Sequence, residues 1–370
     1  MVFLKLGTIA FGGPAAHIAM MEEEFVRRRY WLSESEFLDR LAAANLIPGP
    51  SSTELAIFVG QLKRGWRGLV VAGSCFIVPA ALIVSVIAWA YVRFGSLPQA
   101  EAMLYAIKPV VVAIVVQALG KFSRTGIRTI FLAGLAVLAA VASLLGIGPV
   151  LVLLVAGIIS AIVTWTRSGR QFPSVAVLPK LFAATATAVT AGVAAPVGLL
   201  RLFLSFVRIG SVIFGSGYVL LAFLRSEFVE RLHWLTERQL IDAVAVGQFT
   251  PGPLFTTATF IGYIVAGWPG ALVATVGIFV PGFLLVALCG PFISRFRRAP
   301  LVAAALDGVV AASIALMAVV AWQLGRAAVV DRATLALFLV SVIMLLRFKL
   351  NSVWLIVAAA AVGWTLQILR

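Results

Sequence analysis

A stretch of about fifty residues occurs twice in this sequence, and a Pro-Gly-Pro triplet is its best-preserved part. The triplet stands at 48–50 and again at 251–253. Between residues 3 and 53, about 18 of roughly 51 pairs are identical without a gap, which chance does not produce over such a length. The chain is therefore predicted to be duplicated, with a first repeat at 1–166, a linker at 167–200 and a second repeat at 201–370.

The composition places this duplicated chain in a membrane. Hydrophobic residues make up 62% of the chain and charged residues only 12%, whereas a water-soluble domain carries about 25% charged residues. The net charge of +15 comes from short Lys and Arg clusters between apolar runs. The positive-inside rule produces this distribution, which differs from that of a nucleic-acid-binding face. We predict an all-α integral membrane protein that contacts the lipid bilayer and no nucleic acid.

The first helix of the first repeat is interrupted by glycine and proline. Residues 3–20 are apolar but contain Gly12-Gly13-Pro14. A broken backbone is tolerated in hydrocarbon only against other protein or a water-filled cavity, so this break is expected to face the protein interior. The densely charged residues 22–40 follow and are expected at the membrane surface.

Two short helices flank the first Pro-Gly-Pro triplet. Ser33 and Glu36 have the spacing of a capping box, which predicts a helix from there to about Leu46. A second helix is predicted from Pro50 to about Leu62, with the proline near its first position. Neither reaches the roughly 20 residues that cross about 30 Å of hydrocarbon. The two are therefore predicted to form a re-entrant hairpin with the triplet near mid-membrane.

Conventional apolar spans follow in each repeat. In the first repeat they are predicted at 69–92, 99–119, 127–145 and 148–166. The second repeat is predicted to contain a broken helix at 202–224, a surface segment at 225–238, and spans at 270–293, 301–323, 333–346 and 352–368. Segment 181–200 is weakly apolar and its crossing stays open, so we expect about 10–13 membrane segments.

The charges of equivalent loops relate the two repeats by inversion. The loop at 63–67 is basic, whereas its equivalent at 267–270 carries no charge. The loop at 93–101 is nearly neutral, whereas the loop at the equivalent place carries Arg295, Arg297 and Arg298. Because basic loops face the cytoplasm, equivalent loops are expected on opposite sides of the membrane. We predict inverted-topology repeats with broken and re-entrant helices, an arrangement found in many secondary transporters.

Several paired motifs carry a family resemblance. They are Phe11-Gly12-Gly13-Pro14, the stretch from Glu24 to Leu32, the two Pro-Gly-Pro triplets and Phe214-Gly215-Ser216-Gly217-Tyr218. In combination they resemble the chromate ion transporter family, in its long form with two homologous halves, over nearly the whole chain. The resemblance implies a carrier that exports chromate across the bacterial inner membrane, with sulfate as the usual look-alike anion. Ser216 departs from the glycine that the resemblance leads us to expect there.

The triplets also indicate an anion on physical grounds. The first N–H groups of the helix after each triplet lack an intrahelical partner, and together with the helix dipole they suit a tetrahedral dianion. Hydroxyl side chains and the glycine breaks add further donors at this point. The predicted substrate-binding residues are Gly12, Gly13, Asn45, Pro48, Gly49, Pro50, Ser51, Ser52, Thr53, Gly215, Gly217, Gln248, Pro251, Gly252, Pro253, Thr256 and Thr257.

A simpler explanation competes with this site. Proline and glycine can merely kink packed helices, and hydroxyls can bond back to their own backbone. Two copies related by inversion favour the anion site. Asn45 and Gln248, each three residues before its triplet, fit either role, as donors to an oxyanion or as braces of the turn.

Ionisable residues inside the apolar spans are expected to face a cavity or one another. Lys5 and Arg208 occupy equivalent positions, which suit either countercharges for the anion or side chains that reach the interface. Lys108 and Asp307 are also equivalent, which predicts an ion pair across the repeat interface. Glu54 is the candidate for a carboxylate that takes up and releases a proton.

Other function classes fit the sequence less well. The two histidines, His17 and His233, are far apart, and the chain has neither a DDxxD cluster nor a GxxxxGK[ST] loop. No enzyme, catalytic residue, cofactor or metal site is therefore predicted. A carrier that imports or exchanges sulfate or another oxyanion, and an anion channel, stay open as alternatives, as does a homodimer.

Overall fold

Helices are the only regular elements in the described part of the computed structural model. The described residues are 2–10, 13–45, 47–95, 97–168, 198–213, 219–289, 300–348, 350 and 352–368. The first half contains α1 (Val2–Ile9), α2 (Gly13–Glu22), η1 (Glu23–Arg28), α3 (Glu34–Ala44), α4 (Ser51–Phe94), α5 (Pro98–Gly126), α6 (Ile130–Leu144) and α7 (Pro149–Ser168). The second half contains α9 (Leu199–Val212), α10 (Leu220–Leu224), η3 (Arg225–Arg231), α11 (Glu237–Phe249), η4 (Leu254–Thr256), α12 (Thr257–Cys289), α14 (Pro300–Ala328), α15 (Arg332–Arg347) and α16 (Ser352–Ile368).

The helices have the length and the apolar surface of membrane spans. Among the described residues, five helices are long and apolar enough to cross a membrane, namely α4, α5, α7, α12 and α14, and the apolar helices α6 and α16 are shorter. Large side chains such as Leu138, Ile158 and Val357 are more than half exposed. So much exposed apolar surface requires lipid rather than water around it. The predicted all-α integral membrane protein is thereby confirmed, whereas most of the predicted linker and of segment 181–200 lies outside the described residues.

Several helix ends fall where the sequence predicts them, whereas α5 and α14 extend to Gly126 and Ala328, beyond the predicted ends at 119 and 323. α1 ends at Ile9 and α2 begins at Gly13, so the first helix is interrupted as expected. At the start of α3, Ser33 Oγ accepts from the N–H of Glu36, and the Glu36 carboxylate accepts from the N–H of Ser33. Hydrogen bonds from the backbone N–H and the hydroxyl of Ser33 hold the pKa of the Glu36 carboxyl below its ordinary value. This is the predicted capping box, and Thr236 and Gln239 form its equivalent before α11.

α4 and α12 each contain a sharp reversal of the chain. Gly65 has φ 56°, which ends a short helix at 51–63 and starts a long one at 66–94. Gly60 packs directly on the backbone of Gly68, a contact that a continuous helix cannot make, so the two segments run antiparallel. In α12 the reversal falls at Gly267, with φ 63°. The predicted short helix after the first triplet is confirmed, and it packs against the span that follows it.

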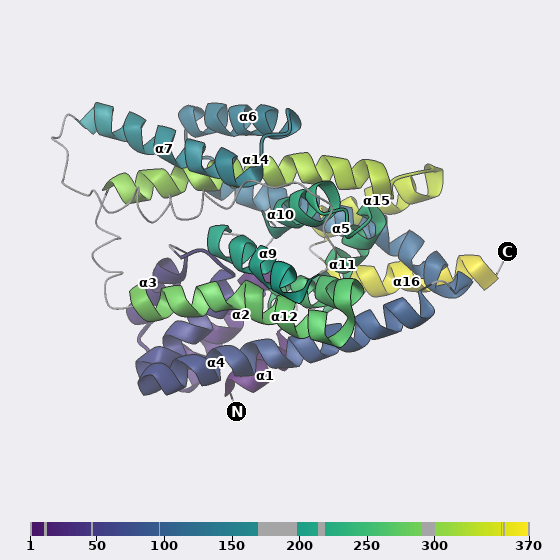
Figure 1. Ribbon diagram of the computed structural model, residues 1–370, viewed down its shortest axis with the longest axis horizontal. Helices are drawn as coiled ribbons and strands as arrows, with labels where there is room; N and C mark the ends of the chain where they lie inside the picture. Colours follow the sequence, from purple (N-terminus) through teal and green to yellow (C-terminus); the bar gives the residue numbers. More distant parts are fainter. Residues whose placement is uncertain are drawn as a thin grey trace.

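Contacts between the helices come in corresponding pairs. α1 packs on α4, and α9 packs on α12. α5 contacts α15 and α16 of the second half, and α14 contacts α6 and α7 of the first half, which lie along it at the upper edge of Figure 1. Each half therefore supplies a helix around which the end of the other half is packed.

Small residues permit the closest of these approaches. Gly7 of α1 faces the backbone carbonyl of Phe76 in α4, and Gly210 of α9 faces that of Ile278 in α12. In a membrane, where lipid is as apolar as leucine, helices associate through such close packing. The first helix of each half is thereby held against the long helix that follows its triplet.

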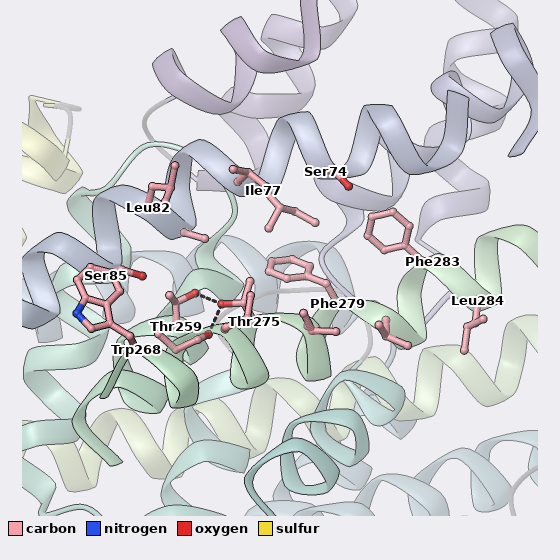
Figure 2. A pocket seen from close by; sticks show the side chains of 16 residues that line it. Ser74, Ile77, Leu82, Ser85, Thr259, Trp268, Thr275, Phe279, Phe283 and Leu284 are labelled. Atoms are coloured by element: carbon pink, nitrogen blue, oxygen red, sulfur yellow. Dashed lines mark hydrogen bonds between the residues drawn. The ribbon is translucent and has the colours of Figure 1, made fainter. Parts of the chain in front are cut away.

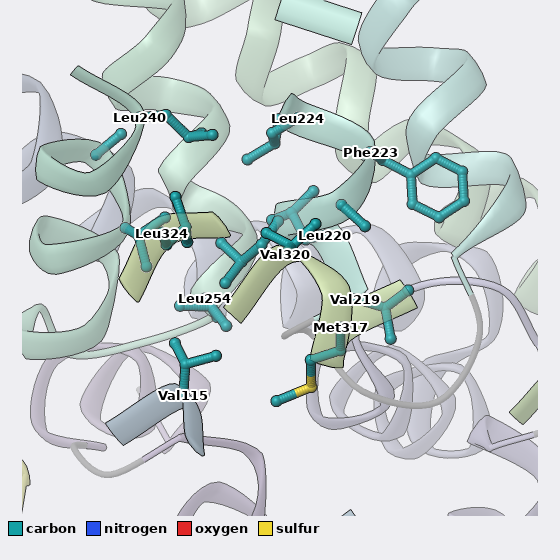
Figure 3. Close-up of a cluster of buried hydrophobic side chains, with 14 of the residues drawn as sticks. Val115, Val219, Leu220, Phe223, Leu224, Leu240, Leu254, Met317, Val320 and Leu324 are labelled. Atoms are coloured by element: carbon teal, nitrogen blue, oxygen red, sulfur yellow. The ribbon is translucent and has the colours of Figure 1, made fainter. Parts of the chain in front are cut away.

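A buried apolar cluster supports the start of α12 (Figure 3). It joins α5, α10, α11 and α14, and its members include Val115, Leu220, Leu224, Leu240, Leu254, Met317, Val320 and Leu324. Leu254 directly follows the second Pro-Gly-Pro triplet, so packing in this cluster fixes the position of that triplet. Many weak dispersion contacts sum to a rigid support here.

Candidate functional site

Each Pro-Gly-Pro triplet is hydrogen-bonded to the interrupted helix of the other half. The backbone N–H of Gly49 donates to the carbonyl oxygen of Ile213, with an N···O distance of 2.7 Å. The N–H of Gly252 donates to the carbonyl oxygen of Ala10 at 2.9 Å. Ala10 and Ile213 lie at the ends of α1 and α9, where helix carbonyls lack an intrahelical partner. The two bonds are equivalent, and both bring a triplet against a helix break.

Both triplet glycines have a backbone conformation that other residues rarely adopt. The φ angle is 134° at Gly49 and 92° at Gly252. A Cβ on Gly49 would overlap the carboxylate of Glu54, and a Cβ on Gly252 would lie 2.6 Å from the Cβ of Ala80. Glycine is therefore required at both turns by conformation and by packing.

The hydroxyl side chains after the first triplet are buried within the protein. Ser51, Ser52 and Thr53 are all buried, and the N–H of Thr53 donates to the carbonyl oxygen of Pro50 at 2.8 Å. Among the described residues, the hydroxyl of Thr53 has no hydrogen-bond partner. A buried hydroxyl without a partner costs free energy, and a bound ligand can recover that cost.

The hydroxyl of Ser52 is engaged by a histidine. It lies 3.3 Å from Nδ1 of His17, and Nε2 of His17 lies 3.0 Å from the carbonyl oxygen of Ala10. Because a carbonyl can only accept, Nε2 carries the proton and Nδ1 accepts from Ser52. The carbonyl of Ala10 thus accepts from both His17 and Gly252. His17 braces the break of the first helix, and Leu220 stands at the equivalent place in the second half.

Glu54, in the first turn of α4, is a buried acid at this place. It is 1% exposed, and neither carboxylate oxygen has a hydrogen-bond partner among the described residues. Helical side chains point toward the helix N-terminus, and Glu54 accordingly packs against Gly49. A Cβ on Gly282 of α12 would lie 3.6 Å from its Oε1. Within the described part of the chain, no group of three or more His, Cys, Asp or Glu residues is arranged to hold a metal ion.

The hydroxyls after the second triplet bond to their own backbone. Thr256 Oγ1 donates to the carbonyl oxygen of Pro253, and Thr257 Oγ1 to that of Leu254, both at 2.8 Å. Both threonines are buried. For these two side chains the structure favours the simpler explanation, because their protons are already committed to the backbone.

The other predicted site residues are placed unequally. Asn45 is exposed at the end of α3, whereas its equivalent Gln248 is buried in α11. Gly13 begins α2. Of the prolines, Pro48 is half-buried, and Pro50, Pro251 and Pro253 are buried. Gly12, Gly215 and Gly217 lie outside the described residues.

Lys5 and Arg208 each lie near a buried acid of their own half, Glu24 and Glu227 respectively. Arg208 Nη1 is 3.9 Å from Glu227 Oε2. Lys5 is exposed. A hydrogen bond from Arg29, and more weakly the charge of Lys5, hold the pKa of the Glu24 carboxyl below its ordinary value. Glu24 and Glu227 are equivalent residues. The placement of a basic side chain beside an acid at the membrane interface is therefore the same in both halves.

Lys108 pairs with Asp242 and not with Asp307. Lys108 Nζ lies 3.4 Å from Asp242 Oδ1, and the hydroxyl of Tyr91 donates to Oδ2 at 2.9 Å. Asp242 is fully buried. The predicted Lys108–Asp307 pair is wrong because α5 packs on α11, which brings Asp242 to Lys108, while Asp307 lies near the charge of Arg128.

The prediction of a paired role for Lys108 named neither Asp242, its partner, nor Tyr91, which donates to Asp242. Asp242 matches Asp39 in the duplicated stretch, and that identity was a signal that it matters. Nothing in the sequence pattern points to Tyr91, because its partner lies in the other half of the chain. A buried ion pair with an added hydrogen bond is costly to break on one side only.

A cavity of about 530 Å³ lies between α4 and α12 (Figure 2). Apolar side chains such as Ile77, Leu82 and Phe279 form most of its wall. The hydroxyls of Thr259 and Thr275 in the same wall bond to each other at 2.7 Å. An apolar wall does not compensate the loss of water around a dianion, so the cavity is not a candidate for the anion site.

Comparisons with known proteins provide the family context. A family model described as chromate transporter matches residues 1–161 and 200–364. A chromate transport protein of Cupriavidus metallidurans is 34% identical over 98% of this chain and 90% of its own length. A probable chromate transport protein of Synechococcus elongatus is 32% identical, over 98% of this chain and 93% of its own length. An uncharacterized transporter of Methanocaldococcus jannaschii is 29% identical, over 98% and 92% respectively. No solved structure matches the chain.

Proposed function

The chain belongs to the chromate transporter family, and from this we propose that it is a secondary transporter that exports chromate across the bacterial inner membrane. Two relatives that match nearly the full length are named as chromate or probable chromate transport proteins, and both come from bacteria. The chain is a multi-pass membrane protein with several apolar helices. These names and this fold favour a transporter over an enzyme.

The proposed carrier consists of two inverted repeats, at 1–166 and 201–370. Three observations support this architecture. The family model matches 1–161 and 200–364 separately. The contacts of α5 with α15 and α16 correspond to those of α14 with α6 and α7. The loop at 63–67 is basic and its equivalent at 267–270 carries no charge, which is the difference that the positive-inside rule leads us to expect for inverted repeats.

The proposed anion site lies at the N-termini of the two helices that follow the triplets. The hydrogen bonds from Gly49 to Ile213 and from Gly252 to Ala10 support it, because they bring both triplets against helix breaks between the halves. α4 begins at Ser51 and η4 at Leu254, so each triplet directly precedes the positive end of a helix dipole. The hydroxyl of Thr53, which has no hydrogen-bond partner within the described ranges, adds a side-chain donor.

The reciprocal pair of triplet bonds is the observation that carries this site. In alternating-access carriers, the substrate binds near the membrane midplane where two repeats meet, at half-helix N-termini. Any rocking of one half against the other must move the triplets relative to the breaks they contact. The anion would therefore sit where the two conformations differ.

Transport in inside-out membrane vesicles tests the proposal. Vesicles that contain the protein should accumulate chromate in a saturable manner, whereas vesicles without it should not. Radiolabelled sulfate in parallel separates a chromate exporter from a general oxyanion carrier. Accumulation only in right-side-out vesicles would indicate an importer, and flux that does not saturate would indicate a channel.

A further inference from the structure

Glu54 is the buried charge that the proposed anion site does not explain. An acid in the first turn of a helix usually lies at the surface or accepts a backbone hydrogen bond. Glu54 is 1% exposed, and both its oxygens are without a hydrogen-bond partner in the described part of the chain. An ionised carboxylate in such a place needs a partner, whereas a protonated one needs far less.

The carboxylate of Glu54 lies directly beside the first triplet, next to its glycine. It packs on Gly49 on one side and approaches Gly282 of α12 on the other. The equivalent residue in the second half is Thr257, whose hydroxyl donates to its own backbone. Only one of the two turns therefore carries an acid, so the pair of turns is alike in backbone but unlike in charge.

Among the described residues, no base pairs with this acid. The triplet presents Gly49 and α12 presents Gly282, neither of which titrates. His17 of α2 reaches this turn through Ser52, whose hydroxyl donates to its Nδ1. Of the charged side chains on the other packed elements, Lys5 of α1 and Asp39 of α3 are exposed, Arg40 of α3 is partly exposed, and Asp242 of α11 pairs with Lys108.

An ionised Glu54 and a dianion at the same turn would repel each other. Charges that are a few ångströms apart inside a protein interact far more strongly than they do in water. Binding of the anion therefore stabilises the protonated acid, and protonation of the acid in turn strengthens anion binding, since linkage acts equally in both directions.

We propose that Glu54 holds a proton that binds together with the anion and crosses the membrane with it. The proton comes from the solvent and no covalent bond changes, so the loaded carrier moves one negative charge per chromate dianion where the anion alone would move two. This inference rests on the proposed anion site at the triplets and adds to it the coupled ion, the residue that carries it and the sense of coupling.

Proton uptake on binding tests the inference without any variant. Purified protein in weakly buffered alkaline solution, where free chromate is the dianion, receives chromate while an indicator dye follows the pH and a separate assay follows bound chromate. One proton should be taken up per chromate bound, and apparent affinity should fall about tenfold per pH unit once Glu54 is ionised in the empty protein.

Two variants identify the group that takes up the proton. Glu54→Gln resembles the protonated acid in shape, so it should bind chromate without proton uptake and with an affinity that no longer falls as pH rises. His17→Gln removes the other titratable contact of this turn and should keep the uptake. In proteoliposomes, a chromate gradient should drive protons in the same direction through the wild type but not through Glu54→Gln.

The outcomes separate this inference from the proposed function. Chromate binding without proton uptake in the wild type, or equal uptake in Glu54→Gln, would overturn the role of Glu54 while leaving chromate transport in place. Proton movement opposite to chromate would overturn the sense of coupling. Failure of the wild type to bind chromate at all would overturn both.

Discussion

The backbone N–H of Gly49 donates a hydrogen bond to the carbonyl oxygen of Ile213 in the other half of the chain, at 2.7 Å. The equivalent bond joins Gly252 to Ala10. Each bond satisfies a carbonyl that a helix end leaves unpaired, and each engages the N–H of a triplet glycine. An anion at this place must therefore draw its N–H donors from the residues after each triplet.

Gly252→Ala should destabilise the folded protein. The φ angle of 92° strains any other residue, and the new Cβ would lie 2.6 Å from Ala80 Cβ, so we expect a loss of at least about 2 kcal/mol. Thermal unfolding of the purified protein in detergent measures it. Gly134→Ala is the matched control, because that helical glycine has open space around it and should gain or lose little. Equal midpoints for the two variants would contradict the packing at the triplet.

Cysteines at equivalent reversals should be labelled from opposite sides of the membrane. Trp66 and Trp268 both lie just after a reversal and are exposed, and in a background without Cys75 and Cys289 they provide matched positions. Trp66→Cys and Trp268→Cys should react with an impermeant maleimide from opposite faces, because inverted repeats place equivalent loops on opposite sides. Labelling of both from one face would refute the inverted arrangement.

Breaking the Lys108–Asp242 pair on one side should cost more than reversing it. Lys108→Ala or Asp242→Ala leaves a buried charge without its partner and should destabilise the protein by about 3 to 5 kcal/mol. The swap of Lys108→Asp with Asp242→Lys should recover part of this loss in a thermal unfolding series, as contacting partners do. The swap of Lys108→Asp with Asp307→Lys should recover none of the lost stability. Recovery in that swap would show that Lys108 pairs with Asp307 and would contradict the pair seen in the structure.

Thr53 and Thr256, which each stand three residues after a triplet, should differ in their effect on the affinity for chromate. Thr53→Val removes a buried hydroxyl that has no partner in the part of the chain that the structure describes, whereas Thr256→Val removes one that donates to Pro253. If the anion takes a charge-assisted bond from Thr53, the concentration for half-maximal chromate uptake should rise roughly tenfold or more, by about 1.5 to 3 kcal/mol. Thr256→Val should change it much less. The opposite order would place the anion at the second triplet.

Much of the fold could be predicted because the membrane restricts what an apolar run can do. α7, α15 and α16 begin and end within about two residues of the predicted spans, since a lipid-embedded chain must satisfy its backbone within each helix. The capping box at Ser33 and the interruption before Gly13 were also predicted. These features depend on residues within one or two turns of each other.

The candidate site was only partly predictable, because parts of it depend on residues that are distant in the sequence. The pattern identified the triplets, the hydroxyls and Glu54, but it could not distinguish Thr53 from Thr256. That difference depends on the rotamer that each threonine adopts within its packed surroundings, which are formed by residues distant in the chain. The roles assigned to these residues stay predictions.

The sequence by itself determined the membrane class and the points at which helices break, because hydrophobicity and backbone preference are local properties. Only the tertiary structure decided the partners: Lys108 with Asp242, Gly49 with Ile213, and Ser52 with His17. Each of these joins segments that are distant in the chain, and the choice depends on which helix fills which groove between its neighbours. Local sequence carries no record of that choice.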